Sequence, residues 1–473
     1  MTRFSDPQVS FADLEFLLQD ITLNPMLAAI SDFIDDNAQL VERVRRDLVR
    51  GLKNPGTGRN GLTAGQVIRS LVLMRVKNWD YRELRERIAD GYTLRRFTDF
   101  YSRPVPKHDA FNRAFNRLTP KSLEAINDLV VRAAVEAGLE DGKRLRVDTT
   151  VAQTDIHHPT DCTLLWDTVR VVTRLVGQLD DVLPPGVPGF TNHTRSARRR
   201  MQQIQRMTPK QRERRQVRKY RELIRTTEQV VENARGVLLQ TKEIRCEDLL
   251  ADISADALRK EIERHCVLGD RVVDQARRRV LLGEDVPVAE KIFSIFETHT
   301  DLIMRGKADK PVEFGHKVFL AESACGLITQ YRVLDGNPCD EKHVEPSLQD
   351  HKETFGRAPE LYGSDRAFYS QENVKACVEA GVKIVCIPQR GGKKTADREA
   401  YESTPAFKKR QRFRAGIEGR ISVLFRGRGM KRAFCEGREH FELLIGAAVL
   451  ANNLMIIGNL LNKRDKTHHK RAA

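Results

Sequence analysis

The stretch Leu145-Arg-Val-Asp-Thr-Thr-Val151 decides the fold, because it predicts the first strand of a sheet after a long run of helical sequence. Its residues alternate in polarity and are rich in β-branched side chains, which is typical of a strand. Asp148 lies within this stretch and directly follows Val147, so the two side chains point to opposite faces of the sheet. Asp148 is therefore a candidate functional carboxylate.

Further strands are expected much later in the chain. Residues 312–322 and 327–335 predict two strands joined by the hairpin sequence Ser-Ala-Cys-Gly. Residues 361–387 then predict a β-α-β unit with strands at 361–364 and 382–387 and a helix between them. A basic loop over 389–414 leads to a helix around Glu418 and a last helix over 441–461. The fold class expected is an α/β core with a mixed five-stranded sheet, whose first strand is separated from the others by a helical insertion.

The chain is long enough for several domains. The boundaries expected are an N-terminal helical segment (1–60), an all-α domain (61–140), the first core strand (141–158), a basic helical insertion (159–289), the rest of the core (290–465) and a basic tail (466–473).

A helix over 107–118 in the all-α domain is a candidate for contact with nucleic acid. Phe111, Phe115 and Leu118 form one buried stripe, and the remaining surface is cationic and rich in amides. Arginine, lysine and asparagine side chains hydrogen-bond phosphates and base edges. An ordinary solvated face is the alternative interpretation. The residues of this surface are Lys107, His108, Asn112, Arg113, Asn116 and Arg117.

Charge points to a polyanionic partner. The chain carries 81 Lys+Arg against 65 Asp+Glu, a net charge of +16. Residues 195–221 hold a dense run of lysines and arginines, among them Arg198, Arg199 and Arg200, with Glu213 as the single acid. A phosphate backbone would relieve the mutual repulsion of these cations. A solvated arm without a ligand is the alternative.

Two more acids are candidate functional carboxylates because of their places in the predicted elements. Asp365 follows the first strand of the β-α-β unit, at the sheet edge where open α/β sheets place functional groups. Glu418 lies on the helix after the last strand, near Gly416 and Gly419. Carboxylate oxygens suit Mg²⁺, and a pair of such ions can stabilise both oxygens of an in-line phosphoryl displacement. Each acid taken singly also fits a turn former or an ion pair.

These motifs resemble the DDE-type insertion-sequence transposases. Asp365-Arg-Ala-Phe368 is similar to the family's Asp-x-Gly/Ala-aromatic signature, and the segment 412–420 is similar to the region around its glutamate. Arg414 matches the arginine of a Tyr-x2-Arg-x3-Glu-x6-Lys pattern. The chain departs from that pattern at Gln411 and Phe425, with Arg426 one residue further on.

The resemblance implies an RNase H-like catalytic core and a helical N-terminal DNA-binding domain. It implies a catalytic and metal-binding triad of Asp148, Asp365 and Glu418 with two Mg²⁺ ions, for which Mn²⁺ can substitute. Arg414 and Arg426 would contact phosphates near the scissile bond, and Arg420 joins the expected DNA-binding residues. The partners implied are transposon-end double-stranded DNA, target DNA and a second copy of the chain in a homodimer.

Two other functions stay open. One is an RNase H-like structure-specific nuclease that cleaves DNA without joining it. The other is a catalytically inactive DNA-binding remnant of a transposase.

We expect a soluble, cytoplasmic and nucleoid-associated protein with no membrane partner. Residues 443–461 are apolar enough to suggest a membrane span, but they include Asn452, Asn453 and Asn459, so a buried helix is favoured. The eight cysteines lack zinc spacing and are expected to be buried thiols.

Overall fold

The computed structural model describes residues 2–3, 10–19, 21–57, 59–184, 187, 189–304 and 311–472, without the side chains of 2–3, 59–60 and 468–472. The chain divides into two compact units. The core unit comprises Met1–Thr154 and Ile303–Ala473, and the insertion unit comprises Asp155–Leu302.

The sheet of the core unit is mixed, as expected, but it has seven strands in the described residues rather than five. Its strands run in the order β4-β5-β3-β7-β8, with β6 also paired to β5 and β9 to β3. Strand β3 pairs antiparallel with β5 and parallel with β7, and β8 continues the parallel side. The two strands beyond the expected five, β4 and β9, are short pieces. The strands are β3 (Arg144–Thr154), β4 (Asp301–Met304), β5 (Val312–Ser323), β6 (Ile328–Val333), β7 (Leu361–Gly363), β8 (Ile384–Cys386) and β9 (Arg432–Ala433).

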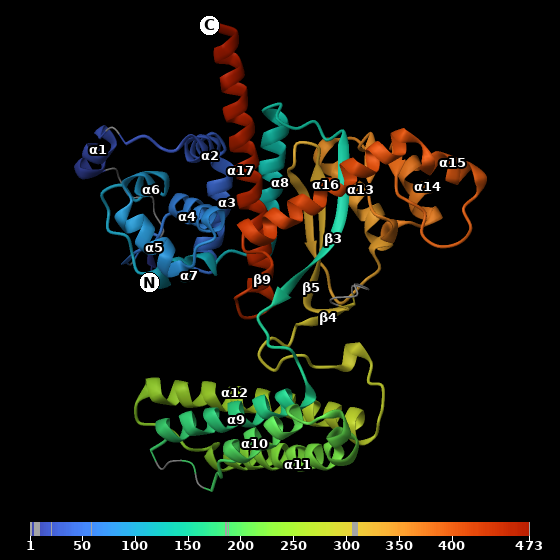
Figure 1. Cartoon of the computed structure of the whole chain (residues 1–473). Coiled ribbons are helices and arrows are strands. Elements are labelled where there is room, and N and C mark those ends of the chain that lie inside the picture. Colours follow the sequence, from blue (N-terminus) through green and yellow to red (C-terminus); the bar gives the residue numbers. More distant parts are fainter. Residues whose placement is uncertain are drawn as a thin grey trace. The chain divides into compact units, whose positions relative to one another are not determined.

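Side chains of β3 alternate between two helical layers. Leu145 and Val147 join a core with Phe319 and Leu348, on the side covered by α13 (Val344–Phe355) and α14 (Gln371–Glu379). The opposite face of the sheet packs against α16 (Pro405–Gly427) and α17 (Arg438–Ala472). Figure 1 shows α16 crossing the sheet close to β3. Asp148 therefore lies on the face covered by α16.

The helical head of the core unit is formed by eight helices. Thr63 and Gln66 form a capping box that begins α4, and Thr119 with Pro120 begins α8. Their apolar faces share one core with residues of α17, which runs beside α8 in Figure 1. The helices are α1 (Phe11–Leu18), α2 (Pro25–Asp36), α3 (Ala38–Val49), α4 (Ala64–Lys77), α5 (Tyr81–Asp90), α6 (Tyr92–Phe97), α7 (His108–Phe115) and α8 (Pro120–Glu136). A two-residue strand pair, β1 (Thr2–Arg3) with β2 (Arg59–Asn60), departs from the helical segment expected over 1–60.

The prediction of a loop over 389–414 is wrong. Helix α15 (Ala396–Ser403) lies inside it, and α16 begins at Pro405. Thr404 caps α16 by accepting a hydrogen bond from the Phe407 amide, and Pro405 stands in its first turn. A Thr-Pro pair also begins α8, but at α16 the pair lies within a segment rich in cations, which is typical of a loop.

Helix α17 contains the apolar stretch that could suggest a membrane span. It is the one helix of the described residues that is long and apolar enough, and most of that stretch is buried inside the protein. Asn453 accepts a hydrogen bond from the Ile328 amide at 2.9 Å and donates to the Asn127 side chain at 2.8 Å. These contacts fit a core helix of a soluble protein.

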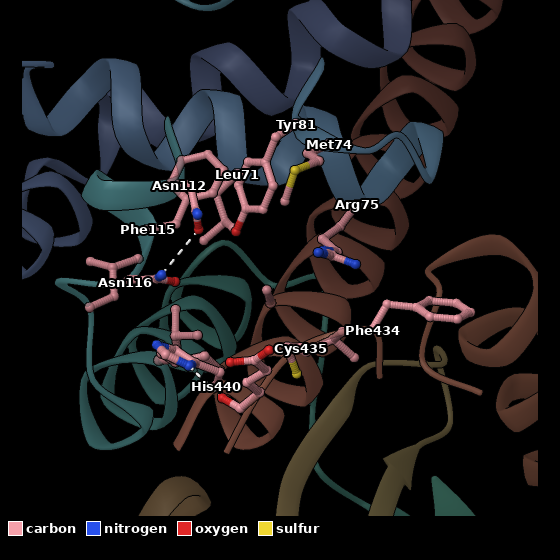
Figure 2. Close-up of a pocket in the computed structure, with 16 residues that line it drawn as sticks. Leu71, Met74, Arg75, Tyr81, Asn112, Phe115, Asn116, Phe434, Cys435 and His440 are labelled. Atoms are coloured by element: carbon pink, nitrogen blue, oxygen red, sulfur yellow. Dashed lines mark hydrogen bonds between the residues drawn. The ribbon is translucent and has the colours of Figure 1, made fainter. Parts of the chain in front are cut away.

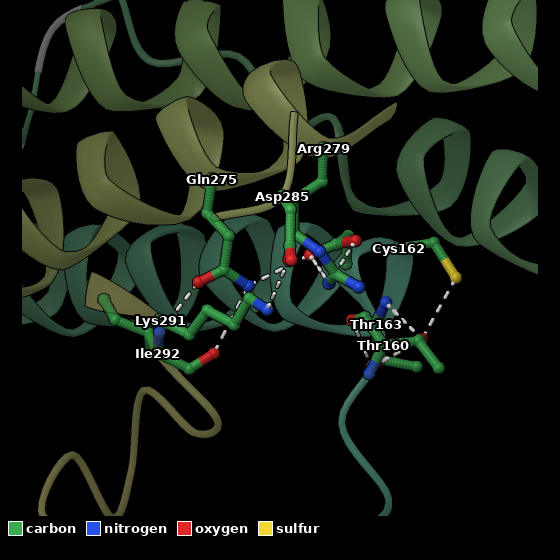
Figure 3. A network of polar contacts seen from close by, with 9 residues as sticks. Thr160, Cys162, Thr163, Gln275, Arg279, Asp285, Lys291 and Ile292 are labelled. Carbon is green, nitrogen blue, oxygen red and sulfur yellow. Dashed lines mark hydrogen bonds and ion pairs between the residues drawn. The ribbon is translucent and has the colours of Figure 1, made fainter. Parts of the chain in front are cut away.

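The insertion unit is a helical bundle with its own apolar core. Its helices are α9 (Asp161–Val182), α10 (Thr194–Gln205), α11 (Pro209–Thr241) and α12 (Leu249–Ala276), followed by η1 (Arg277–Leu281) and η2 (Val288–Glu290). Figure 3 shows a polar network that joins the start of α9 to the end of α12. Gln275 and Arg279 both donate to Asp161, and the Ile292 amide donates to Gln275. The network therefore ties the beginning of the insertion unit, at the start of α9, to its last part, after α12.

The cysteines are only partly buried, contrary to the expectation. None forms a disulfide; Cys162, Cys266, Cys377 and Cys386 are buried, whereas Cys339 is exposed.

A buried carboxylate anchors α16 to the sheet, and its loss is expected to destabilise the protein. Glu322 of β5 is fully buried and pairs with Arg146 at 2.7 Å and with Arg420 at 3.0 Å. We predict that Glu322→Gln lowers the free energy of unfolding by about 3 kcal/mol, because two partly buried guanidinium groups lose their counter-charge. Urea unfolding measures it. Glu360→Gln, which removes an exposed partner of Lys383, is the control and should change little. A Glu322→Gln protein as stable as the control would contradict the anchoring role.

Candidate active site

Asp148 lies in the middle of β3, opposite Leu320 of β5. Its side chain is only 13% exposed. The Thr149 amide donates to its Oδ1 at 2.8 Å, and the Thr149 hydroxyl donates to Asp340 at 2.9 Å. Lys317 pairs with Asp340 at 2.7 Å. A second carboxylate, itself neutralised by a lysine, thus stands close to Asp148.

Asp365 follows β7, the strand that pairs with the start of β3. It caps η4 (Arg366–Phe368) by accepting a hydrogen bond from the Ala367 amide at 2.9 Å. The tight turn after a short parallel strand directs this carboxylate to the edge of the sheet. Its side chain is about one-third exposed.

Glu418 lies on α16, one turn after Arg414. Its side chain is 67% exposed. Helix α16 approaches β3 so closely that a Cβ at Gly416 would lie 2.1 Å from Arg146 Nη1. Arg146 also donates to the carbonyl of Phe413 at 2.7 Å. Glycine at 416 therefore sets how near α16, and with it Glu418, can come to the strand that carries Asp148.

The three acids meet at one guanidinium group. Arg414 Nη2 donates to Asp148 at 2.8 Å and lies 3.7 Å from Asp365 Oδ2, while its Nη1 donates to Glu418 at 3.2 Å. The Arg414 side chain is 12% exposed, and its Nε is buried without a hydrogen-bond partner. Three residues that are far apart in sequence therefore form one acidic cluster around a single cation.

The electrostatics of the cluster favour a cation. The pKa of Asp148 is raised to about 6, chiefly by burial and also by the negative charges of Asp365 and Asp340, against the lowering effect of Arg414 and the Thr149 amide. An ionised Asp148 is costly here unless positive charge stands next to it. Arg414 supplies that charge in the structure.

We tested whether the same residues fit a metal ion. Within the described ranges, no three His, Cys, Asp or Glu side chains are close enough together to form a ready metal cage. The donor set is nevertheless that of a hard divalent cation, because it consists of carboxylate oxygens alone. The guanidinium stands between these oxygens, so its departure would leave three acids facing one space. In this structure the cation among these oxygens is the Arg414 guanidinium.

The helix α7 presents the expected nucleic-acid surface only in part. Asn112, Arg113 and Asn116 are exposed, as is Lys107 just before the helix. His108 pairs with Asp109 at 3.1 Å. Arg117 instead donates to the carbonyl of Arg50 at 2.7 Å, so its guanidinium ties the end of α7 to α3.

Of the other arginines expected to bind DNA, some are exposed and some make contacts within the protein. Arg198, Arg199 and Arg426 are exposed. Arg200 pairs with Glu222 at 3.5 Å, and Arg420 bridges Glu322 and Asn452. Arg200 and Arg420 therefore make contacts within the protein, which the sequence alone did not indicate.

A cationic groove in the insertion unit was not predicted as such. It lies along α10 and α11, has a volume of about 420 Å³ and is lined by lysine, arginine, glutamine and one methionine, with no carboxylate. Its cations are Arg199, Arg206, Arg215 and Lys219. The dense charge of 195–221 was the signal, but only the packing of the two helices shows which of its members face one another.

Comparisons with models of known protein families, with curated proteins and with solved structures gave no match to this chain. The geometry described above therefore carries the functional argument.

The raised pKa of Asp148 predicts a pH-dependent difference in stability between the wild type and Asp148→Asn. The folded protein binds a proton here more tightly than the unfolded chain, so this residue stabilises the fold least above its folded pKa of about 6. As pH rises from about 4 to 7, Asp148→Asn should gain up to about 3 kcal/mol relative to the wild type. Urea unfolding at several pH values with a chelator present measures it.

The exposed-acid variant Glu372→Gln, scanned in the same way, gives the baseline. A difference between Asp148→Asn and the wild type that does not vary with pH would show that Asp148 ionises freely in the folded protein.

Proposed function

We propose that this protein is a DNA transposase of the DDE type, with Asp148, Asp365 and Glu418 as its catalytic acids. The observation that carries the proposal is the convergence of these three carboxylates on Arg414. The chain has sixty-five acids, and most sets of three would lie apart. The meeting of the three acids that the sequence motifs indicate supports the proposal.

The topology of the core supports the proposal. Three antiparallel strands (β6, β5 and β3) continue into two parallel strands (β7 and β8), with helices on both faces. This is the kind of mixed sheet expected of an RNase H-like core. The helical insertion follows β3 directly, so the strand that carries Asp148 is separated in sequence from the strands it pairs with.

The acids would hold two Mg²⁺ ions, for which Mn²⁺ can substitute. Asp148, Asp365 and Glu418 would be the residues that hold these ions. When bound, the ions would stabilise the attacking and leaving oxygens of the phosphodiester displacement.

Arg414 has two roles in this proposal. Without metal it neutralises the acids and keeps them together. Once the acids have another counter-ion, its fork of donors is released to bind a phosphate oxygen of the DNA near the scissile bond. Arg426, exposed further along the same helix, would contact the backbone as well.

DNA binding is assigned to two surfaces. Helix α7 would read the inverted-repeat end through Lys107, Asn112, Arg113 and Asn116. The groove along α10 and α11 would bind phosphates without regard to sequence. The two ends of a transposon must be brought together in one reaction. A homodimer assembled on transposon-end and target DNA is therefore the expected complex. It would act in the cytoplasm, at the nucleoid.

The triad is tested by cleavage and binding together. We predict that Asp148→Asn and Glu418→Gln each abolish Mg²⁺-dependent cleavage of a cognate end, while the affinity for that end stays within about threefold, because the acids do not supply the binding energy. Gel assays with labelled end duplexes measure both quantities. Glu372→Gln, an exposed acid on α14, is the matched control and should cleave as the wild type does.

A strand-transfer assay with pre-cleaved ends then separates a transposase from a nuclease. Joined product supports the transposase, whereas cleavage without joining would identify a nuclease. Full cleavage by Asp148→Asn would remove Asp148 from the active site.

The groove of the insertion unit predicts a change in salt dependence. Replacing Arg199, Arg206 and Arg215 with glutamine should reduce the slope of log affinity against log salt by about 2.7, since each phosphate contact contributes roughly 0.9. The control triple replaces Arg245, Arg264 and Arg277, which are exposed but paired with acids of the same unit. Fluorescence anisotropy with a random-sequence duplex measures the slopes. Equal slopes for the two triple variants would show that the groove does not bind DNA.

A further inference from the structure

A cavity of about 380 Å³ lies in the core unit between the helical head and α17. Helices α4, α7 and α8 supply one side of it, and the segment 434–436 with the first turns of α17 supplies the other. Much of its lining is apolar, including Leu71, Phe115 and Leu443. Figure 2 shows the polar side chains around the same space. None of the candidate catalytic acids lines it.

Arg75 is the charged group of this cavity that has no counter-ion. It comes from α4, and the structure gives its guanidinium neither an ion pair nor a hydrogen bond among the described residues; its Nε is completely buried. Burial lowers the pKa of Arg75. Desolvating a guanidinium group without a partner is costly. Such a group is expected to be retained for a ligand of opposite charge.

Other donors line the same cavity. Asn116 donates to the Asn112 side chain at 3.0 Å, which leaves the Asn112 amide nitrogen with no acceptor among the described residues. His440 donates from Nδ1 to the Glu436 carbonyl at 2.7 Å, so this proton is used within the protein and the ring is positioned beside the cavity. In Figure 2 the asparagines and His440 lie on opposite sides of the space. Glu436 is the single acid of the lining, and Arg75 forms no ion pair with it.

The entrance adds an aromatic platform and a further cation. Phe434 is 76% exposed, and the Arg432 guanidinium lies over its ring at 5.7 Å. A half-buried arginine with a buried Nε, amide donors and an exposed aromatic ring together suit a phosphate that is attached to an organic group. A free carboxylate ligand would gain less from the aromatic ring.

We propose that this cavity binds one backbone phosphate of the DNA, with Arg75 as its principal donor and Phe434 against the adjoining sugar. The inference rests on the proposed function for the identity of the polymer. A phosphate bound in this cavity would also fix the position of the DNA on the protein. A phosphate bound here contacts both the helical head and α17, which packs on the catalytic sheet. DNA read by α7 is thereby fixed relative to the three acids.

The test combines DNA affinity with protein stability. Arg75→Met keeps the apolar stem but removes the charge. It should weaken binding of a labelled random-sequence duplex at least about tenfold and lower the salt slope by about 0.9. Because an unpaired buried charge is removed, its thermal midpoint should equal or exceed that of the wild type. Arg75→Lys should recover the salt slope but only part of the affinity. Arg46→Met is the matched control, since Arg46 is exposed and paired with Glu42.

A measurement on the wild type covers the case in which Arg75→Met does not fold. Cys435 lines the cavity, so bound duplex should slow its alkylation, as followed by mass spectrometry. Cys325, hydrogen-bonded to Glu140 at the β5–β6 hairpin, is the internal reference. Unchanged alkylation of Cys435, or Arg75→Met binding with wild-type affinity and slope but lower stability, would overturn the proposal and make Arg75 a structural residue.

The two proposals fail separately. If Asp148→Asn abolishes cleavage while Arg75→Met binds as the wild type does, the transposase stands and the phosphate site falls. If the wild type never cleaves but Arg75→Met still loses affinity and slope, the phosphate site stands and the catalytic assignment falls.

Discussion

The core unit depends on one contact, in which the Arg414 guanidinium provides the positive charge that three neighbouring carboxylates need in a partly buried site. Asp148 lies on a strand, Asp365 on the turn after another strand and Glu418 on a helix, and Arg414 contacts all three. The arrangement holds only while α16 stays against β3, which glycine at 416 permits. Without that close approach, Arg414 would not reach Asp148, whose burial already raises its pKa to about 6. The cluster is thus held together by the cation that a metal would have to replace, so metal affinity depends on the balance between the two.

A second ion cluster supports this one from the same helix. Arg420 is six residues after Arg414 on α16 and meets Glu322, which also binds Arg146 of β3. Arg146 and Asp148 are two residues apart on β3, so their side chains lie on the same face of the sheet. The Glu322 cluster and the candidate active site therefore share strand β3 and helix α16. The Glu322 cluster is centred on a fully buried carboxylate with two partly buried guanidinium groups, as expected of a structural anchor. The Arg414 cluster is more open, with an unpartnered Arg414 Nε and the exposed Glu418 at its end.

Local sequence signals predicted the elements, while contacts between distant residues escaped prediction. Alternation at 145–151 placed β3, and the capping box at Thr63 placed α4, because both depend on near neighbours. The three acids could be chosen because strand ends and a helix after the last strand are positions visible in the sequence. The start of α16 was missed, since the helix signal of Thr404 and Pro405 lay within a run of cations. Arg117 and Arg420 could not be separated from DNA-facing arginines, because their partners Arg50 and Glu322 are remote in the sequence.

The cations behind the net charge of +16 are therefore of two kinds. Arginines such as Arg146 and Arg420 are neutralised by buried acids and maintain the fold. The cations that line the groove along α10 and α11 face one another with no carboxylate among them, and Arg75 lies in an apolar cavity with no counter-ion. Repulsion in the groove costs stability that the Lys219–Glu222 ion pair offsets only in part, and Arg75 has no ion pair among the described residues. A polyanion that binds at both places would relieve each cost, so the placement of the unneutralised charge favours DNA more strongly than its amount does.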